Sequence, residues 1–215
     1  MKIYLDSANI EDIKRLNDLG IIDGITTNPT LVAKEGKNYT EVIKEICKIV
    51  NGPISAEVLA TTAKEMITEG LAYAKLHKNI VVKIPMTAEG LKAIKELSSK
   101  GIPVNTTLIF NSLQALLAAK AGSKYVSPFI GRIDDISYDG MSIIAETTEI
   151  FKNYNFKTEI IVASIRNPLH IRDAALLGAD ICTCPANIIE QIMKHPLTDI
   201  GLKKFLDDYE KAKKK

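Results

Sequence analysis

Short apolar runs alternate with longer amphipathic segments along the whole chain. The runs are rich in Ile and Val and nearly free of charge, which is typical of strands buried on both faces of a parallel sheet. They predict strands at residues 3–6, 22–28, 54–58, 80–85, 103–108, 124–129, 158–164 and 180–184.

Between these runs, apolar residues recur at the spacing of a helix with one buried face. This period predicts helices at residues 10–19, 39–50, 62–77, 88–99, 112–121, 139–154, 166–177 and 185–194, and a last amphipathic helix at about 199–212. Four glycines follow helical segments at positions where a left-handed residue is usually needed: Gly20, Gly101, Gly122 and Gly178.

Eight strand-and-helix units in 215 residues leave about 27 residues for each unit, which is enough for a small (β/α)8 TIM barrel. We therefore expect one α/β barrel domain over residues 1–215, with an extra C-terminal helix. A doubly wound open sheet is the alternative fold. The glycine-rich nucleotide-binding motifs that often accompany that alternative are missing from the sequence.

Composition narrows the function classes. The chain is 46% hydrophobic and 25% charged, as in ordinary globular proteins, and its net charge of +2 does not favour nucleic acid or an anionic membrane as a partner. The acidic residues of the first twelve positions do not fit a secretory signal, and no apolar run is long enough to span a membrane, so we expect a cytoplasmic protein. The three cysteines and three histidines lack the spacing of a metal site; Cys182 and Cys184 are expected to pack rather than react.

Polar residues gather at the predicted carboxyl ends of the strands, which is where a barrel places its chemistry. They are Asp6, Thr26, Asn28, Glu57, Lys83, Asn105, Thr107, Ser127, Ser164 and Arg166. Amides and hydroxyls in such positions can bind a polyol. The late strands are followed by Arg132 and Arg166, which could bind phosphate together with helix N-termini, or could form surface salt bridges, for instance from Arg132 to Asp134 or Asp135.

Lys83 stands out because it interrupts an otherwise apolar run at residues 80–85. Burial disfavours an ammonium, and a neutral amine is a nucleophile suited to Schiff-base chemistry with a carbonyl. The alternative is a structural lysine that pairs with Asp6 or Glu57, or that reaches outward from an edge strand. Asp6 and Glu57 could serve as general acid and base, although Asp6 could equally cap the helix that begins near Asn9.

Five segments of the chain resemble the small transaldolase and fructose-6-phosphate aldolase family of class I aldolases. They are LDSAN at 5–9, GITTNPTL at 24–31, VKIP at 82–85, NTTLIF at 105–110 and SPFIGRID at 127–134. The resemblance implies that Lys83 forms a Schiff base, that Asp6 accepts the hydroxyl proton during cleavage, and that Glu57 works with an ordered water. It also implies substrate-binding positions at Thr26, Asn28, Asn105, Thr107, Ser127, Phe129, Arg132, Ser164 and Arg166.

The resemblance further implies an activity. A transaldolase of the pentose phosphate pathway would move a dihydroxyacetone unit from sedoheptulose 7-phosphate or fructose 6-phosphate to glyceraldehyde 3-phosphate or erythrose 4-phosphate, without metal or cofactor. The alternative is the aldolase branch, which releases free dihydroxyacetone and typically carries Gln, Ala and Tyr at the positions of Glu57, Ser127 and Phe129. A phosphosugar isomerase or a non-catalytic binding barrel remain hypotheses from other classes.

The family also implies a homo-oligomer, a pentamer or decamer, in which the last helix reaches onto a neighbouring subunit. In this chain the helix at 199–212 carries the apolar residues for such a contact. The alternative is that this helix covers the N-terminal opening of its own barrel.

Overall fold

A computed structural model describes residues 1–36 and 38–213. Eight parallel strands pair in chain order and close into a barrel, because β8 also pairs with β1. The strands are β1 Lys2–Asp6, β2 Gly24–Thr26, β3 Ile54–Glu57, β4 Ile80–Pro85, β5 Val104–Ile109, β6 Tyr125–Pro128, β7 Glu159–Val162 and β8 Ile181–Cys184. The closed barrel confirms the predicted (β/α)8 fold, and the open-sheet alternative is wrong.

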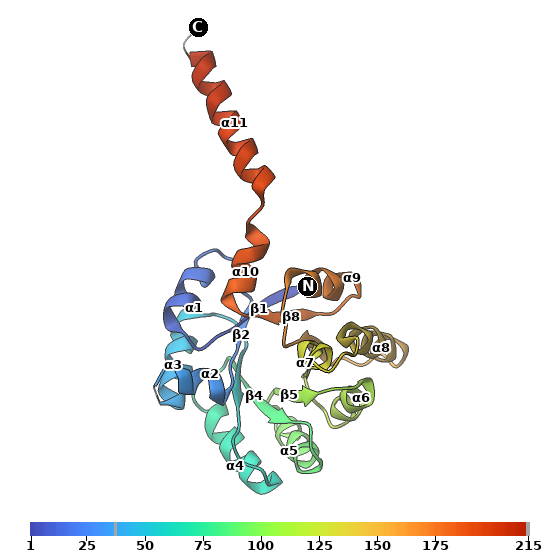
Figure 1. Cartoon of the computed structure of the whole chain (residues 1–215). Coiled ribbons are helices and arrows are strands. Elements are labelled where there is room, and N and C mark those ends of the chain that lie inside the picture. Colours follow the sequence, from blue (N-terminus) through green and yellow to red (C-terminus); the bar gives the residue numbers. More distant parts are fainter. Residues whose placement is uncertain (37, 214–215) are drawn as a thin grey trace.

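Helices surround the strands on all sides (Figure 1). They are α1 Ile10–Asn17, α2 Pro29–Lys34, α3 Tyr39–Ile49, α4 Ala63–Ala74, α5 Ala88–Ser99, α6 Ser112–Lys120, α7 Ile130–Asp134, α8 Gly140–Asn153, α9 Pro168–Leu176, α10 Ala186–Met193 and α11 Pro196–Lys213. Nine of these elements correspond to predicted helices. The four glycines predicted to be left-handed all have positive φ, between 71° and 99°.

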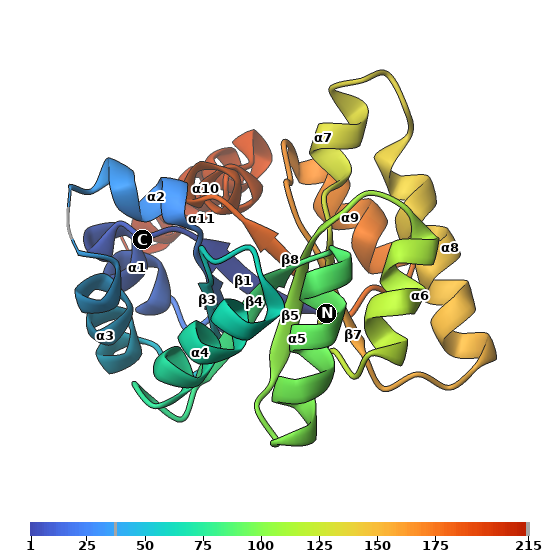
Figure 2. The same ribbon diagram turned by 90° about the horizontal axis from the view of Figure 1, so that it is seen from below.

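Two short helices, α2 and α7, were not predicted. They follow β2 and β6 and lie on the same side of the barrel (Figure 2). Asn28 begins α2 by accepting a hydrogen bond from the backbone N–H of Leu31, and Pro29 supplies a first helical residue with a fixed φ. With six and five residues, these helices are too short to display an amphipathic period.

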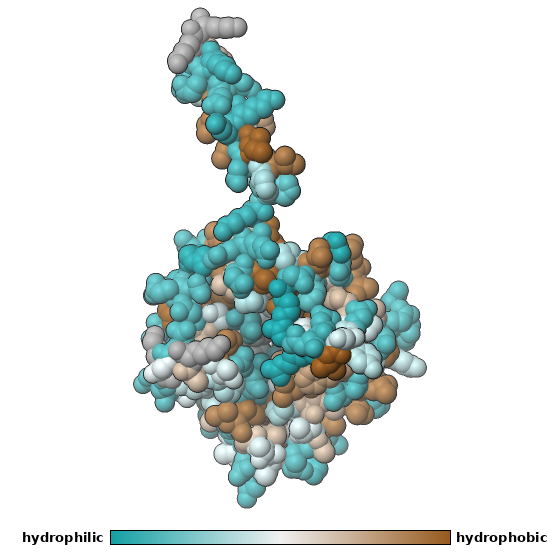
Figure 3. All heavy atoms as spheres, in the orientation of Figure 1, coloured by the Kyte–Doolittle hydropathy of each residue, from teal (hydrophilic) through white to brown (hydrophobic). Residues whose placement is uncertain are grey.

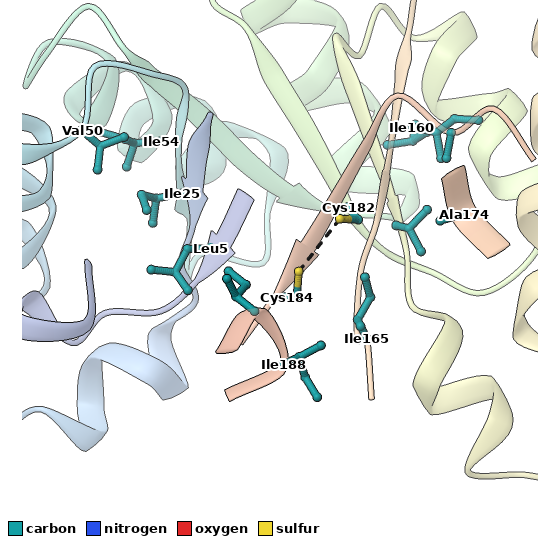
Figure 4. Close-up of a cluster of buried hydrophobic side chains, with 14 of the residues drawn as sticks. Leu5, Ile25, Val50, Ile54, Ile160, Ile165, Ala174, Cys182, Cys184 and Ile188 are labelled. Carbon is teal, nitrogen blue, oxygen red and sulfur yellow. Dashed lines mark hydrogen bonds between the residues drawn. The ribbon is translucent and has the colours of Figure 1, made fainter. Parts of the chain in front are cut away.

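The main core lies between the outer faces of the strands and the surrounding helices. Leu5, Ile25 and Ile54 point outward into it, and so do Cys182 and Cys184 of β8 (Figure 4). The two thiol sulfurs are 3.9 Å apart and both residues are fully buried. The cysteines therefore pack in the core as the sequence predicts.

The inside of the barrel has an apolar layer of five buried residues: Tyr4, Val81, Tyr125, Ile161 and Ile181. Gly24 makes room for one of them. A Cβ at Gly24 would lie 2.8 Å from the Tyr4 ring and 2.7 Å from a backbone oxygen of Pro53. Since side chains alternate along a strand, the residue two positions after each member faces inward as well, one level closer to the strand ends.

The last helix, α11, extends away from the barrel instead of covering one of its openings (Figure 1). It begins at Pro196 and ends at Lys213, somewhat longer than the predicted segment, and none of its residues is buried. Several apolar side chains remain exposed on it: Leu197, Ile200, Leu202, Phe205, Leu206 and Tyr209. Some of them are visible as brown spheres on the projecting helix in Figure 3. Among the described residues, no helix is long and apolar enough to cross a membrane.

Candidate active site

A cavity of about 600 Å³ opens at the carboxyl ends of the strands. Ten of the predicted site residues line it: Asp6, Thr26, Asn28, Glu57, Lys83, Ser127, Phe129, Arg132, Ser164 and Arg166. Two other predicted residues, Asn105 and Thr107, are fully buried and do not line the cavity. The barrel thus brings most of the predicted residues to one place, as expected for inward positions at the ends of parallel strands.

Lys83 and Glu57 are paired by register, because they lie opposite each other on β4 and β3. The Lys83 Nζ is 2.9 Å from Glu57 Oε2 and donates a second hydrogen bond, of 3.1 Å, to the backbone carbonyl of Thr27. Only 6% of the Lys83 side chain is exposed, so it does not reach outward from the barrel. Lys83 therefore forms the ion pair with Glu57 that was one of the alternatives. The same contact places the Glu57 carboxylate where it can take a proton from the Lys83 amine.

Asp6 is the last residue of β1 and faces the cavity. Burial raises the pKa of its carboxyl above the ordinary 3.8, while the nearby Lys83 and a hydrogen bond from Thr26 oppose that rise. The Thr26 hydroxyl lies 2.8 Å from Asp6 Oδ1. Asp6 does not cap the following helix. Asn9 does so instead, with its side chain accepting from the backbone N–H of Asp12, because Asp6 still belongs to the strand.

A second hydrogen-bonded group lies beneath the cavity. Asn105 donates to the Ser55 hydroxyl over 3.1 Å and accepts from the Ser127 hydroxyl over 2.7 Å. Both contacts join neighbouring parts of the barrel interior and leave Asn105 fully buried. In this structure Asn105 therefore positions Ser127, which itself lines the cavity.

Thr107 is displaced from the cavity wall by an irregularity in β5. The register between β5 and β6 shifts between Thr106 and Ile109, and Leu108 has a positive φ of 58°. Leu108 lines the cavity, whereas the Thr107 hydroxyl is buried without a hydrogen-bond partner in the described part of the chain. A β-bulge of this kind re-aims side chains, and the sequence pattern carried no sign of it.

Two arginines, Arg132 and Arg166, also line the cavity. The Arg132 guanidinium lies over the Phe129 ring, 5.0 Å from its centroid. Within the described residues it forms no salt bridge with Asp134 or Asp135, so that alternative is wrong. Asp135 pairs with Arg166 over 2.9 Å instead. Asp134 lies 3.2 Å from the His170 imidazole. Two guanidinium groups thus line the cavity, Arg166 with Asp135 as its partner, and guanidinium groups are suited to bind an anionic group such as phosphate.

Backbone packing holds this wall close to the strand ends. Ser164 has a positive φ of 63°, and its carbonyl oxygen would lie only 2.1 Å from a Cβ at position 131. The Arg166 side chain would lie 2.8 Å from the same Cβ. Glycine is therefore required at Gly131, because any side chain there would push the Ser164 and Arg166 segment away.

Sequence reasoning missed three polar residues that support the site. Ser55 and Thr183 face the barrel interior, and Thr183 lines the cavity. Tyr39 of α3 accepts a hydrogen bond of 2.6 Å from the backbone N–H of Glu57, and burial raises the pKa of its phenol to about 12. The alternation of β3 and β8 carried the signal for Ser55 and Thr183, whereas nothing in the sequence indicated that a helix residue, Tyr39, reaches the end of β3.

The described residues contain no cluster of three His, Cys, Asp or Glu side chains arranged to hold a metal ion. What the cavity offers instead is an amine, two carboxylates, hydroxyls and two guanidinium groups. This set can perform covalent and acid–base chemistry on a phosphorylated polyol with a carbonyl group.

Comparison with known proteins agrees with this chemistry. Residues 3–215 match the family described as "Transaldolase/Fructose-6-phosphate aldolase". A protein named "Probable transaldolase" from Moorella thermoacetica is 61% identical over 215 residues, which cover both chains completely. Another of the same name, from Aquifex aeolicus, is 58% identical over the whole of this chain and 99% of its own. The chain therefore belongs to the transaldolase/fructose-6-phosphate aldolase family.

Proposed function

We propose that this protein is a transaldolase that moves a dihydroxyacetone unit from a ketose phosphate to an aldose phosphate through a Schiff base on Lys83. The observation that carries the proposal is the Lys83 amine between two carboxylates. Glu57 pairs with it directly, and Asp6 on β1 lines the same cavity and interacts with its charge. The donors would be fructose 6-phosphate or sedoheptulose 7-phosphate, as in the pentose phosphate pathway.

Imine formation begins with the Lys83 proton. Glu57 is the nearest carboxylate, at 2.9 Å, and is positioned to take that proton so that the free amine can attack the C2 ketone. The resulting carbinolamine loses its hydroxyl as water, with Glu57 returning the proton. The product is a protonated imine that can accept an electron pair.

Cleavage then breaks the bond between C3 and C4 of the donor. Asp6 takes the proton of the C4 hydroxyl, the C3–C4 electron pair moves into the imine, and glyceraldehyde 3-phosphate leaves. The enamine remains on Lys83. When erythrose 4-phosphate enters, C3 attacks its aldehyde carbon, Asp6 gives the proton to the new hydroxyl, and water releases sedoheptulose 7-phosphate from the imine.

The two ends of the cavity fit the two ends of such a sugar. Asn28 and Ser127 line the cavity together with Lys83 and would bind the hydroxyls of the dihydroxyacetone unit. Arg132 and Arg166 would bind the phosphate at the far end. Phe129 contributes a ring without a hydroxyl, so it supplies no proton to the enamine, and this favours transfer over release of free dihydroxyacetone.

Product analysis tests this function. The purified protein is incubated with fructose 6-phosphate, with and without erythrose 4-phosphate, and without added metal. We expect sedoheptulose 7-phosphate only when the acceptor is present. Brisk formation of free dihydroxyacetone without an acceptor would assign the protein to the aldolase branch, and no product in either mixture would contradict both.

We also propose that the protein is a homo-oligomer, a pentamer or decamer, joined in part by α11. Leu202 and Tyr209 each lie three or four residues from the adjacent pair Phe205 and Leu206, and all four side chains are more than half exposed. Such a stripe on a helix without a partner in its own barrel favours contact with a second copy. Sedimentation of the full chain should show an oligomer that Phe205→Glu weakens; a wild-type monomer would contradict the proposal.

A further inference from the structure

Thr183 lies at the centre of β8 and faces the barrel interior, between the outward-facing Cys182 and Cys184. It is 4% exposed and touches the cavity wall beside Asp6. Its β1 partner in the sheet register is Tyr4, two residues before Asp6, and Asp6 itself pairs with Thr26 on the other side of β1. The barrel therefore brings Thr183, Thr26 and Asp6 together from three neighbouring strands.

These three side chains form a hydrogen-bonded chain with a fixed direction. The Thr26 hydroxyl lies 2.8 Å from Asp6 Oδ1 and 2.6 Å from the Thr183 hydroxyl. An ionised carboxylate only accepts, so Thr26 must give its single hydrogen to Asp6. Thr183 must then donate its own hydrogen to Thr26. The ionised Asp6 carboxylate thus sets the direction of both hydrogen bonds, with Thr183 as the first donor and Thr26 as the second.

We propose that Thr183 is a positioning residue for the reaction, which holds the Thr26 hydroxyl as a donor to Asp6 and so stabilises the carboxylate that accepts the substrate proton. The inference rests on the function proposed above. A donor chain of two hydroxyls strengthens the last hydrogen bond, since the first bond polarises the second. Without Thr183, the Thr26 hydroxyl still points to Asp6 but loses the donor that polarises it, and the ionised form of Asp6 loses part of its stabilisation.

The other groups that act on Asp6 would be unchanged by substitution at Thr183. Lys83 faces it from β4 and favours the carboxylate, while Glu57 on β3 is paired with that lysine. The Cys184 thiol on β8 also interacts with the Asp6 charge, but it lies on the opposite face of its strand. Thr183→Val keeps β-branching and nearly the same shape, so it removes the hydroxyl while preserving the strand.

The test compares Thr183→Val with Thr183→Ser, which keeps a hydroxyl. Thr147→Val on α8 is the matched control, because Thr147 is equally buried and its hydroxyl has no hydrogen-bond partner in the described structure. We expect the acid limb of kcat/KM for fructose 6-phosphate to move about 0.5 to 1 pH unit upward in Thr183→Val only. Thr183→Ser and Thr147→Val should keep the wild-type limb.

Other results would overturn the proposal. A raised KM with an unmoved acid limb would make Thr183 a substrate contact, and unchanged kinetics in Thr183→Val would make its hydroxyl dispensable. Carbon-13 NMR titration of the Asp6 carboxyl in the same variants gives a second reading that needs no turnover. If the wild type forms no transfer product, the proposed function fails, yet this titration still decides the role of Thr183. Thr183→Ala replaces Thr183→Val in both measurements if the valine variant does not fold.

Discussion

Two adjacent layers inside the barrel come from the same strands but have opposite character. Tyr4, Val81, Tyr125, Ile161 and Ile181 make the lower layer, which is wholly buried and contains mostly hydrocarbon. Two residues further along the chain from each of these stand Asp6, Lys83, Ser127, Ala163 and Thr183, four of which are polar, and all five line the cavity. Only two residues along the chain therefore separate the packed apolar layer from the side chains that line the cavity.

The chemistry of the upper layer depends on the lower layer. The lower layer excludes water from beneath the cavity, so the charged groups above it interact in a medium less polar than water. Desolvation raises the pKa of Asp6 for this reason. We expect substitutions in the upper layer to change catalysis strongly, and substitutions in the lower layer to change mainly stability.

The largest effect is expected from Lys83→Met, which removes the nucleophile of the upper layer. Transfer activity should fall to background. The substitution also leaves Glu57 without its partner at a mostly buried position, which should cost about 3 kcal/mol of unfolding free energy. The double variant with Glu57→Gln should recover most of that stability in denaturant titrations but no activity. Transfer activity in either variant would contradict the proposed role of Lys83.

Asp6→Asn should lower kcat by roughly 10²- to 10⁴-fold, because it removes the proposed base. The free energy of unfolding of Asp6→Asn should instead be higher than that of the wild type at neutral pH. The folded state holds the Asp6 proton more tightly than the unfolded chain, so the wild type loses stability as pH rises from the ordinary pKa of 3.8 through the raised one. The variant escapes this loss. Urea unfolding should find it more stable than the wild type at pH 7, with a smaller difference below pH 3.8; equal differences at both pH values would refute the argument.

Arg132→Ala should have an intermediate effect that is confined to phosphorylated substrates. Loss of one charge-assisted contact should raise KM for fructose 6-phosphate about 10- to 100-fold. Reaction with unphosphorylated dihydroxyacetone, followed by borohydride trapping, should be nearly unchanged. A similar loss for both substrates would mean that Arg132, which stacks on Phe129, shapes the cavity instead of binding phosphate.

The smallest effect on catalysis is expected from Ile161→Val in the lower layer. Removing one buried methyl group should cost about 1 kcal/mol of unfolding free energy. The kcat should stay within twofold of the wild type, since Ile161 lies below the reacting groups. A large loss of kcat with normal stability would show that the two layers are not separable.

The sequence predicted the barrel well because the buried strands are short runs of mostly apolar or β-branched residues that alternate with amphipathic segments. The same pattern made Lys83 noticeable, because it is the one charged residue in the run at 80–85. The sequence also suggested that Asp6 caps the following helix, since Asp is common at that position. This alternative is wrong, because the cap of α1 is Asn9.

Other features depend on geometry that the pattern does not carry. The bulge that puts Leu108 on the cavity wall in place of Thr107 comes from a register shift between two strands. The direction of the hydrogen bonds that join Thr183 to Asp6 requires the barrel to be closed between β8, β1 and β2. The short helices α2 and α7 lack the length to show a period.

The central claim is that Lys83 carries the covalent intermediate, and trapping tests it most directly. The wild-type protein is incubated with fructose 6-phosphate, reduced with borohydride and digested with trypsin. The reduced adduct should be found on the peptide from Asn79 to Lys92, with cleavage blocked after Lys83. An adduct on another lysine, or transfer activity without any trapped adduct, would contradict the account.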